Sequence, residues 1–122
     1  MKRSVIVCGL LICSIPLFAQ IRNGQNLKLY SWTKNGQETG MVEQVSSAVV
    51  QTNGNEIKYT MRTKDSGAIV IEFNRVTKRL HYKPEPDQLV SVIGSFSESG
   101  SNSIFSFTDD KGDAQVLKFR RI

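Results

Sequence analysis

Apolar and polar residues alternate along three short runs between residues 55 and 83, and polar turns separate the runs. In the middle run, Ile69, Ile71 and Phe73 fall on one face, and the residues between them fall on the other. A period of two residues is typical of a strand with one buried and one exposed face. The three runs therefore predict a β-meander with a dry and a wet side.

The same alternation extends along the chain and predicts eight strands, at residues 26–33, 41–52, 55–63, 67–74, 77–83, 88–97, 103–108 and 114–121. The connections are short, and no segment between the strands has the length of a helical crossover, so we expect an all-β, antiparallel, up-and-down order. Such a meander removes its free edges by closing into a small β-barrel, and an open sandwich is the alternative. The inward positions are rich in large apolar residues, which favours a filled interior.

Three details of the pattern concern individual elements. The valines of segment 41–52 favour a strand, but its apolar residues also fit one face of a helix, which is the alternative. Tyr30 and Trp32 share one face of the first strand and are predicted to cover one end of the barrel. Gly94, inside a strand, is expected to allow a bend or a close approach between neighbours.

The start of the chain has the pattern of a bacterial secretory signal, with two basic residues, an apolar run over 5–18, and Ala19 before the predicted cut. We therefore expect a signal peptide at 1–19 and a single β-barrel domain at 20–122. The apolar run is shorter than the ~20 residues that a membrane-spanning helix needs. The mature protein is expected to be exported to the periplasm, the cell surface or the medium.

Lipidation at Cys13 is the alternative processing. Residues 10–13, Leu-Leu-Ile-Cys, have the outline of a lipoprotein cleavage box, although Ile12 stands where such boxes carry a smaller residue. A lipid there would tether the protein to the outer membrane, and no membrane contact is predicted otherwise. Cys8 and Cys13 are the only cysteines, so the domain after cleavage at Ala19 is expected to contain no disulfide and no thiolate metal site.

Charge and side-chain chemistry argue against several classes of function. Loss of residues 1–19 removes two of the 16 Lys and Arg residues and none of the 11 Asp and Glu residues, so the net charge falls from +5 to about +3. A charge this small does not indicate nucleic-acid binding. His81 is the only histidine, and Asp109, Asp110 and Asp113 lack the spacing of a calcium loop. The sequence therefore predicts that the protein is not an enzyme and binds neither a metal ion nor a cofactor.

The size, the secretory signal, the absence of cysteine after cleavage and the eight-strand meander resemble the potempins, small bacterial envelope proteins that block secreted peptidases with loops of a β-barrel. The resemblance implies an exported inhibitor of a secreted endopeptidase of the serine or metallo type. It also implies an inhibitory loop, for which the chain offers two polar connections. Their residues are Lys34, Asn35, Gly36, Gln37, Glu38 and Thr39 in the first, and Lys64, Asp65 and Ser66 in the second.

The two connections offer different groups to the two peptidase classes. Lys34 or Lys64 would suit the acidic specificity pocket of a trypsin-like peptidase. The carboxylate of Glu38 or Asp65 would suit the zinc ion of a metallopeptidase. In either case a rigid scaffold would hold the loop ready to bind.

Two further hypotheses remain open. A tryptophan on the first strand and Arg120 or Arg121 on the last resemble the lipocalin and calycin barrels, although Tyr30-Ser31-Trp32 replaces the Gly-x-Trp of that family. This resemblance implies a barrel that carries a small ligand, in an internal cavity lined by Tyr59, Phe73, Tyr82 and Phe105. The other hypothesis is an accessory or structural subunit of an envelope complex, which an exposed apolar strip or edge strand would indicate.

Overall fold

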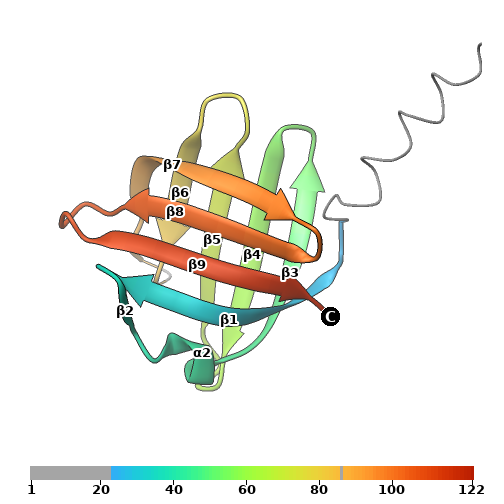
Figure 1. Ribbon diagram of the computed structural model, residues 1–122, viewed down its shortest axis with the longest axis vertical. Helices are drawn as coiled ribbons and strands as arrows, with labels where there is room; N and C mark the ends of the chain where they lie inside the picture. Colours follow the sequence, from blue (N-terminus) through green and yellow to red (C-terminus); the bar gives the residue numbers. More distant parts are fainter. Residues whose placement is uncertain (1–22, 86) are drawn as a thin grey trace, which may run out of the picture.

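The computed structural model describes residues 23–85 and 87–122, so the predicted signal peptide and Cys13 lie outside the described residues. The elements are β1 (Asn26–Lys34), β2 (Gln37–Glu38), α2 (Met41–Gln44), β3 (Val45–Asn53), β4 (Glu56–Thr63), β5 (Ala68–Asn74), β6 (Arg79–Lys83), β7 (Val90–Ser99), β8 (Asn102–Thr108) and β9 (Ala114–Arg121) (Figure 1). In this part of the chain, no helix is long and apolar enough to cross a membrane.

The strands form one closed antiparallel sheet. Consecutive strands from β3 to β9 pair with one another, and β1 pairs with both β3 and β9. The β1–β9 pairing runs from Leu27 opposite Arg121 to Lys34 opposite Gln115 and closes the barrel (Figure 1). The predicted eight-stranded barrel is confirmed and the open sandwich is wrong. β2 is an additional two-residue strand folded back onto the end of β1.

Segment 41–52 contains both of the structures considered for it. α2 is four residues long, little more than one helical turn, and follows Gly40, whose φ of 83° is in the left-handed region. From Val45 onward the segment is strand β3, which pairs with β4. The strand prediction is therefore confirmed for all but the first four residues.

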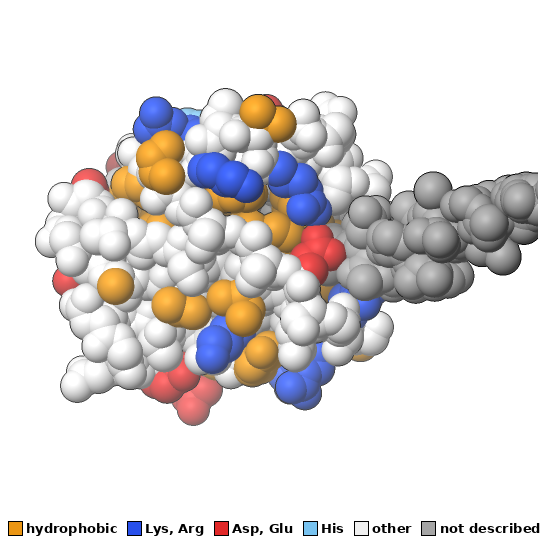
Figure 2. Space-filling model, turned by 45° about the horizontal axis from the view of Figure 1, so that its top comes forward, with side chains coloured by type: hydrophobic (Ala, Val, Ile, Leu, Met, Phe, Trp, Pro, Cys, Tyr) orange, Lys and Arg blue, Asp and Glu red, His pale blue; other side chains and the backbone are white. Residues whose placement is uncertain are grey.

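The connections gather at two ends of the barrel because antiparallel strands alternate in direction. What we term the closed end carries the β3–β4, β5–β6 and β7–β8 turns, at residues 54–55, 75–78 and 100–101. The open end carries the β1–β2, β4–β5, β6–β7 and β8–β9 connections, whose described residues are 35–36, 64–67, 84–85, 87–89 and 109–113. The β3–β4 and β5–β6 turns of the closed end lie at the top of Figure 1. Figure 2 brings this top forward and shows Lys and Arg side chains beside apolar ones.

Basic side chains cover the core at the closed end. The Arg75 guanidinium lies 5.4 Å from the ring centroid of Phe96 and pairs with the Glu98 carboxylate at 2.9 Å. The Lys78 ammonium lies 6.0 Å from the ring centroid of Phe73. Long cationic side chains thus shield the aromatic rings from water while their charged heads stay hydrated.

An aromatic cluster fills the interior next to the closed end. The ring of Tyr59 meets those of Phe105 and Phe119 edge to face, with centroids 4.8 Å apart in both pairs. The Tyr59 hydroxyl donates to Oγ of Ser103 at 2.8 Å, so this buried polar group is satisfied. The predicted inward positions are buried as expected: Ile57, Tyr59, Met61, Ile69, Ile71, Phe73, Leu80, Tyr82, Phe105, Phe107, Leu117 and Phe119.

The predicted shared face of Tyr30 and Trp32 is wrong. An irregularity in the β1–β9 register between Leu29 and Ser31 inserts one extra residue, so the alternation of faces shifts by one. Trp32 therefore points into the barrel and is 3% exposed. Tyr30 stays outside, where the Arg120 guanidinium lies 4.9 Å from its ring centroid. The basic residue of the last strand thus packs on Tyr30 and not on the tryptophan.

Gly94 makes the close approach that the sequence predicts. A Cβ atom at this position would lie 2.9 Å from Cδ1 of Leu80 and 3.0 Å from the backbone oxygen of Ser106. The first distance is shorter than real side-chain carbons show, and the second is tighter than most of their contacts. The backbone oxygen belongs to a paired strand that cannot easily move. A side chain at this point would push β7 away from its neighbours.

We therefore predict that Gly94→Ala lowers the free energy of unfolding by about 1–3 kcal/mol, measured by urea denaturation. The matched control is Ser95→Ala, which changes the exposed neighbouring position on the same strand and is expected to stay within about 0.5 kcal/mol of the wild type. Equal stability of Gly94→Ala and the wild type would contradict the close contact.

Candidate ligand site at the open end

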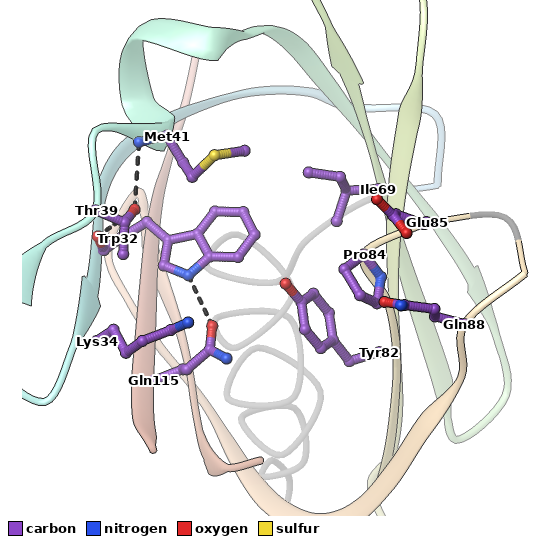
Figure 3. Close-up of a pocket in the computed structure, with 10 residues that line it drawn as sticks. All are labelled: Trp32, Lys34, Thr39, Met41, Ile69, Tyr82, Pro84, Glu85, Gln88 and Gln115. Carbon is purple, nitrogen blue, oxygen red and sulfur yellow. Dashed lines mark hydrogen bonds between the residues drawn. The ribbon is translucent and has the colours of Figure 1, made fainter. Parts of the chain in front are cut away.

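A cavity of about 390 Å³ opens at the open end of the barrel (Figure 3). Its apolar wall is built from Trp32 of β1, Met41 of α2, Ile69 of β5 and Tyr82 of β6. The rings of Trp32 and Tyr82 meet edge to face, with centroids 6.1 Å apart. Elements far apart in the sequence thus converge on one apolar surface above the packed core.

Hydrogen bonds fix the tryptophan in this wall. Nε1 of Trp32 donates to Oε1 of Gln115 at 2.9 Å, and Nε2 of Gln115 donates to Oδ2 of Asp109 at 2.7 Å. Gln115 is 3% exposed. Both polar atoms of this buried amide therefore have partners, as buried polar groups require. The other carboxylate oxygen of Asp109 accepts backbone N–H groups from Lys111 and Asp113, each at 2.9 Å. The indole is therefore held in one orientation by the β8–β9 turn.

The Asp109 carboxylate is stabilised in its charged form. Its partial burial acts to raise the pKa, but hydrogen bonds from the backbone of Asp113 and the side chain of Gln115 outweigh burial and lower the pKa below its usual value. The Lys34 charge acts in the same direction. Asp109 therefore remains an acceptor for Gln115 throughout the neutral pH range.

The Tyr82 hydroxyl is a buried polar group that faces the cavity. Tyr82 is 8% exposed, and Figure 3 shows its oxygen directed toward the space between Trp32 and Ile69. Among the described residues no hydrogen bond to this oxygen is formed, in contrast to the Tyr59 hydroxyl, which donates to Ser103. Burial first, and the negative charge of Asp109 second, raise the pKa of Tyr82 to about 12. The cavity wall therefore includes a neutral O–H group that is directed at the interior of the cavity.

The cavity continues sideways into a second hollow of about 430 Å³ between the β6–β7 and β8–β9 connections. The two share Lys34, Tyr82, Pro84, Gln88 and Gln115. Charges of both signs border them, from Lys34 and Lys111 and from Glu85 and Asp110. The mouth is thus apolar in its depth and mixed in charge at its rim, an arrangement suited to an amphipathic guest.

The first predicted inhibitory segment is a tight hairpin. Asn35 and Gly36 form its turn with φ of 54° and 83°, as the Asn-Gly pair predicts, and Gln37 pairs back with Lys34. The side chain of Asn35 bonds Oδ1 of Asp113 and the backbone N–H of Ala114, both at 2.9 Å. The turn is therefore tied to the β8–β9 connection and does not form a long extended loop.

The rest of this segment folds back along β1. The Glu38 carboxylate accepts the Ser31 hydroxyl at 2.7 Å, and the N–H of Thr39 donates to the carbonyl of Trp32 at 3.0 Å. Glu38 is thus already engaged in an intramolecular contact. Lys34 and Thr39 are the members of this segment that line the cavity.

The second predicted segment is an equally short turn. The Asp65 carboxylate accepts the hydroxyl of Thr63 and the N–H of Gly67, and the Thr63 bond lowers the pKa of Asp65. The N–H of Lys64 donates to the carbonyl of Gln44 at 2.9 Å, which links the turn to α2. The structure therefore brings both predicted segments to the open end, on elements that border the cavity.

The cavity lining predicted from the sequence is wrong for three of its four residues. Tyr82 does line a cavity, but the rings of Tyr59, Phe73 and Phe105 belong to the packed aromatic cluster. The signal that was present in the sequence is Gln115, an amide at an inward position of β9 where the alternation otherwise selects Leu117 and Phe119. A polar side chain at an inward position requires a buried partner.

Comparisons with known proteins assign no relative to the chain: no family model, no curated protein and no solved structure matches it. The resemblance to the potempins and that to the calycins therefore stay predictions. Within residues 23–85 and 87–122, no group of three or more His, Cys, Asp or Glu side chains is arranged to hold a metal ion.

The raised pKa of Tyr82 predicts a loss of stability at alkaline pH. An unfolded tyrosine ionises near pH 10 and the folded one at about 12, so the unfolded state is favoured as the pH rises above 10. Between pH 8 and pH 11 the wild type is therefore expected to lose about 1 kcal/mol more unfolding free energy than Tyr82→Phe loses. Urea denaturation at both pH values measures it, with Tyr30→Phe as the exposed-side control. An identical pH dependence of the wild type and Tyr82→Phe would contradict the burial of this hydroxyl.

Proposed function

We propose that this protein is a non-enzymatic, exported binding protein that takes a small amphipathic ligand into the open end of its barrel. The observation that carries the proposal is the Tyr82 hydroxyl, which is buried, faces the cavity and has no hydrogen-bond partner among the described residues. The hydroxyl borders an open cavity with an apolar wall, where a ligand oxygen would accept its hydrogen bond. The export of the protein rests on its predicted signal peptide.

The lining sets the chemistry of the ligand. A volume of about 390 Å³ suits a small molecule of one or two rings. The indole edge of Trp32 and the side chains of Met41 and Ile69 would contact an apolar ring, and the Tyr82 hydroxyl would bond a hydroxyl or carbonyl oxygen. Lys34 and Glu85 at the rim would tolerate a polar end that faces water.

Trp32 provides the test because it is the only tryptophan of the chain and forms part of the cavity wall. Borneol and camphane share one apolar skeleton and differ in a hydroxyl group, so they form a matched pair of probes. We expect both to change the Trp32 fluorescence saturably. Borneol should bind about fivefold more tightly, the equivalent of one net hydrogen bond of roughly 1 kcal/mol.

In Tyr82→Phe the preference for borneol over camphane is expected to disappear while camphane binding is retained. Tyr30→Phe, on the outer face, serves as the matched control and should keep the preference. No saturable fluorescence change with either probe, or an unchanged preference in Tyr82→Phe, would contradict the proposal.

Peptidase inhibition is the second candidate function, favoured by the meeting of both predicted segments at the open end. Their turns are held by hydrogen bonds from Asn35 to Asp113 and from Lys64 to Gln44, so little conformational freedom would be lost on binding. A peptidase would then meet a rim of short, rigid turns, with Lys34 and Lys64 as its basic groups.

Titration of the predicted mature chain, residues 20–122, against trypsin-like, subtilisin-like and zinc-dependent endopeptidases tests this second function. We expect stoichiometric loss of peptidase activity with the barrel left uncut. For a trypsin-like target, Lys34→Ala or Lys64→Ala should weaken inhibition at least tenfold. Lys58→Ala, on the side of the barrel, should have no effect. Full peptidase activity across the panel, or cleavage of the barrel at the same rate as a denatured substrate, would argue against inhibition.

A further inference from the structure

The charged residues are divided unequally between the two ends of the barrel. The closed end, taken as its turns and the three residues of each strand at that end, has seven basic and three acidic residues. The open end, taken in the same way with β2 and α2 included, has five basic and eight acidic residues. The net charge is therefore +4 at the closed end and −3 at the open end. The basic residues of the closed end are Lys28, Lys58, Arg75, Lys78, Arg79, Arg120 and Arg121.

Two exposed aliphatic side chains lie among these basic groups. Val76 in the β5–β6 turn is 69% exposed, and Ile93 of β7 is 60% exposed. Arg79 is the direct partner of Ile93 in the β6–β7 pairing, and the N–H of Gly94 donates to the carbonyl of Lys78 at 2.9 Å. Lys78 and Arg79 are exposed and form no ion pair with a described residue. We call Val76, Lys78, Arg79 and Ile93 the basic-apolar patch.

The three acidic residues of the closed end are Glu56, Glu72 and Glu98. Glu98 pairs with Arg75 at 2.9 Å, and Glu72 lies opposite Lys58 on the neighbouring strand. Glu56, at the start of β4, lines one small hollow together with Arg79 of the patch. These three acids are included in the net charge of +4, so this end stays positive.

The β5–β6 turn holds the patch in a fixed shape. Oδ1 of Asn74 accepts the N–H groups of Val76 and Thr77 at 2.9 and 3.0 Å. The N–H of Lys78 donates to the carbonyl of Asn74 at 2.8 Å. Lys78 has a φ of 62°, in the left-handed region that favours glycine. The backbone of the turn therefore does not require a lysine at this position.

The chain enters the barrel at this same end. Oδ1 of Asn23, the first described residue, accepts the N–H of Thr52 at 3.0 Å, beside the β3–β4 turn. Cys13, the alternative lipidation site predicted from the sequence, precedes Asn23 by ten residues. Ten residues span at most about 36 Å. A lipid on Cys13 would therefore attach the barrel to a membrane by its closed end.

We propose that the closed end docks on an anionic phospholipid bilayer. Lys78 and Arg79 would pair with lipid phosphates, and Val76 and Ile93 would enter the headgroup region, where their side chains leave water. The separation of charge would turn the closed end toward the negative surface. A bilayer accommodates the projecting β5–β6 turn (Figure 1), whereas a protein partner would need a hollow of matching shape. This docking is independent of the ligand proposed for the open end.

Vesicle co-sedimentation of residues 20–122 tests the docking without the apolar run of the predicted signal peptide. Vesicles of equal parts phosphatidylglycerol and phosphatidylcholine are compared with vesicles of phosphatidylcholine alone. We expect saturable binding to the anionic vesicles and at least tenfold weaker binding to the neutral ones. Raising the NaCl concentration from about 0.1 M to about 0.5 M should release most of the bound protein, because salt screens the charges. Equal binding to both kinds of vesicle, or to neither, would overturn the proposal.

Charge removal locates the contact. Lys78→Gly and Arg79→Gln are each expected to weaken binding to anionic vesicles about fivefold, the effect of one basic residue near such a surface. Lys78→Gly also relaxes the left-handed backbone, so its loss of binding would not reflect unfolding. Lys83→Gln, at the open-end terminus of the same strand, is the matched control and should bind as the wild type does. Wild-type binding by both patch variants would contradict the assignment.

The apolar part of the patch distinguishes a bilayer from an acidic protein partner. The double variant Val76→Ser/Ile93→Ser is expected to lose at least fivefold in vesicle binding, because two apolar side chains no longer leave water. Its binding to polyglutamate, a soluble acidic probe, should equal that of the wild type. Unchanged vesicle binding by the double variant, with polyglutamate bound more tightly than vesicles, would assign the patch to an acidic protein and overturn the proposal.

Discussion

The pairing of β1 with β9 is the constraint on which the rest of this structure depends. It closes the sheet, and the extra residue between Leu29 and Ser31 turns Trp32 into the barrel. The same pairing brings Gln115 of β9 within 2.9 Å of the indole nitrogen. Without the irregularity, Trp32 would face water, and the Gln115 amide would be a buried polar group without a donor to accept from. The strand pairing that closes the barrel therefore also assembles the candidate site.

The two ends of the barrel differ in how the buried tyrosine at each end is packed and hydrogen-bonded. At Tyr59 the aromatic rings pack tightly and Ser103 accepts the hydroxyl, so this half of the interior is filled. At Tyr82 the surrounding elements leave a cavity, and the hydroxyl faces it. A small barrel has room for side chains or for one small ligand. In this chain, side chains fill one half of the interior, and the other half contains the cavity that we propose as the ligand site.

Much of the fold was predictable because most strands are regular, and alternation alone then assigns the inward residues from Ile57 to Phe119. The inward residues of β1 could not be assigned in this way. The one-residue irregularity depends on the partner strand, and it moves every later residue of β1 to the opposite face. The candidate site was less accessible still. Trp32, Tyr82 and Gln115 are far apart in the sequence, and their contact follows from closure. Gln115 alone gave a local signal, as an amide among inward apolar residues.

An intermolecular NOE map of the protein with borneol bound tests ligand binding at the open end most directly. We expect NOEs from the borneol methyl groups to the indole of Trp32, the methyl group of Met41 and the ring of Tyr82, all of which line the open-end cavity. NOEs to Val42 and Val45, which line a separate hollow, or to the outer face at Tyr30, with none to Trp32, would contradict ligand binding at the open end.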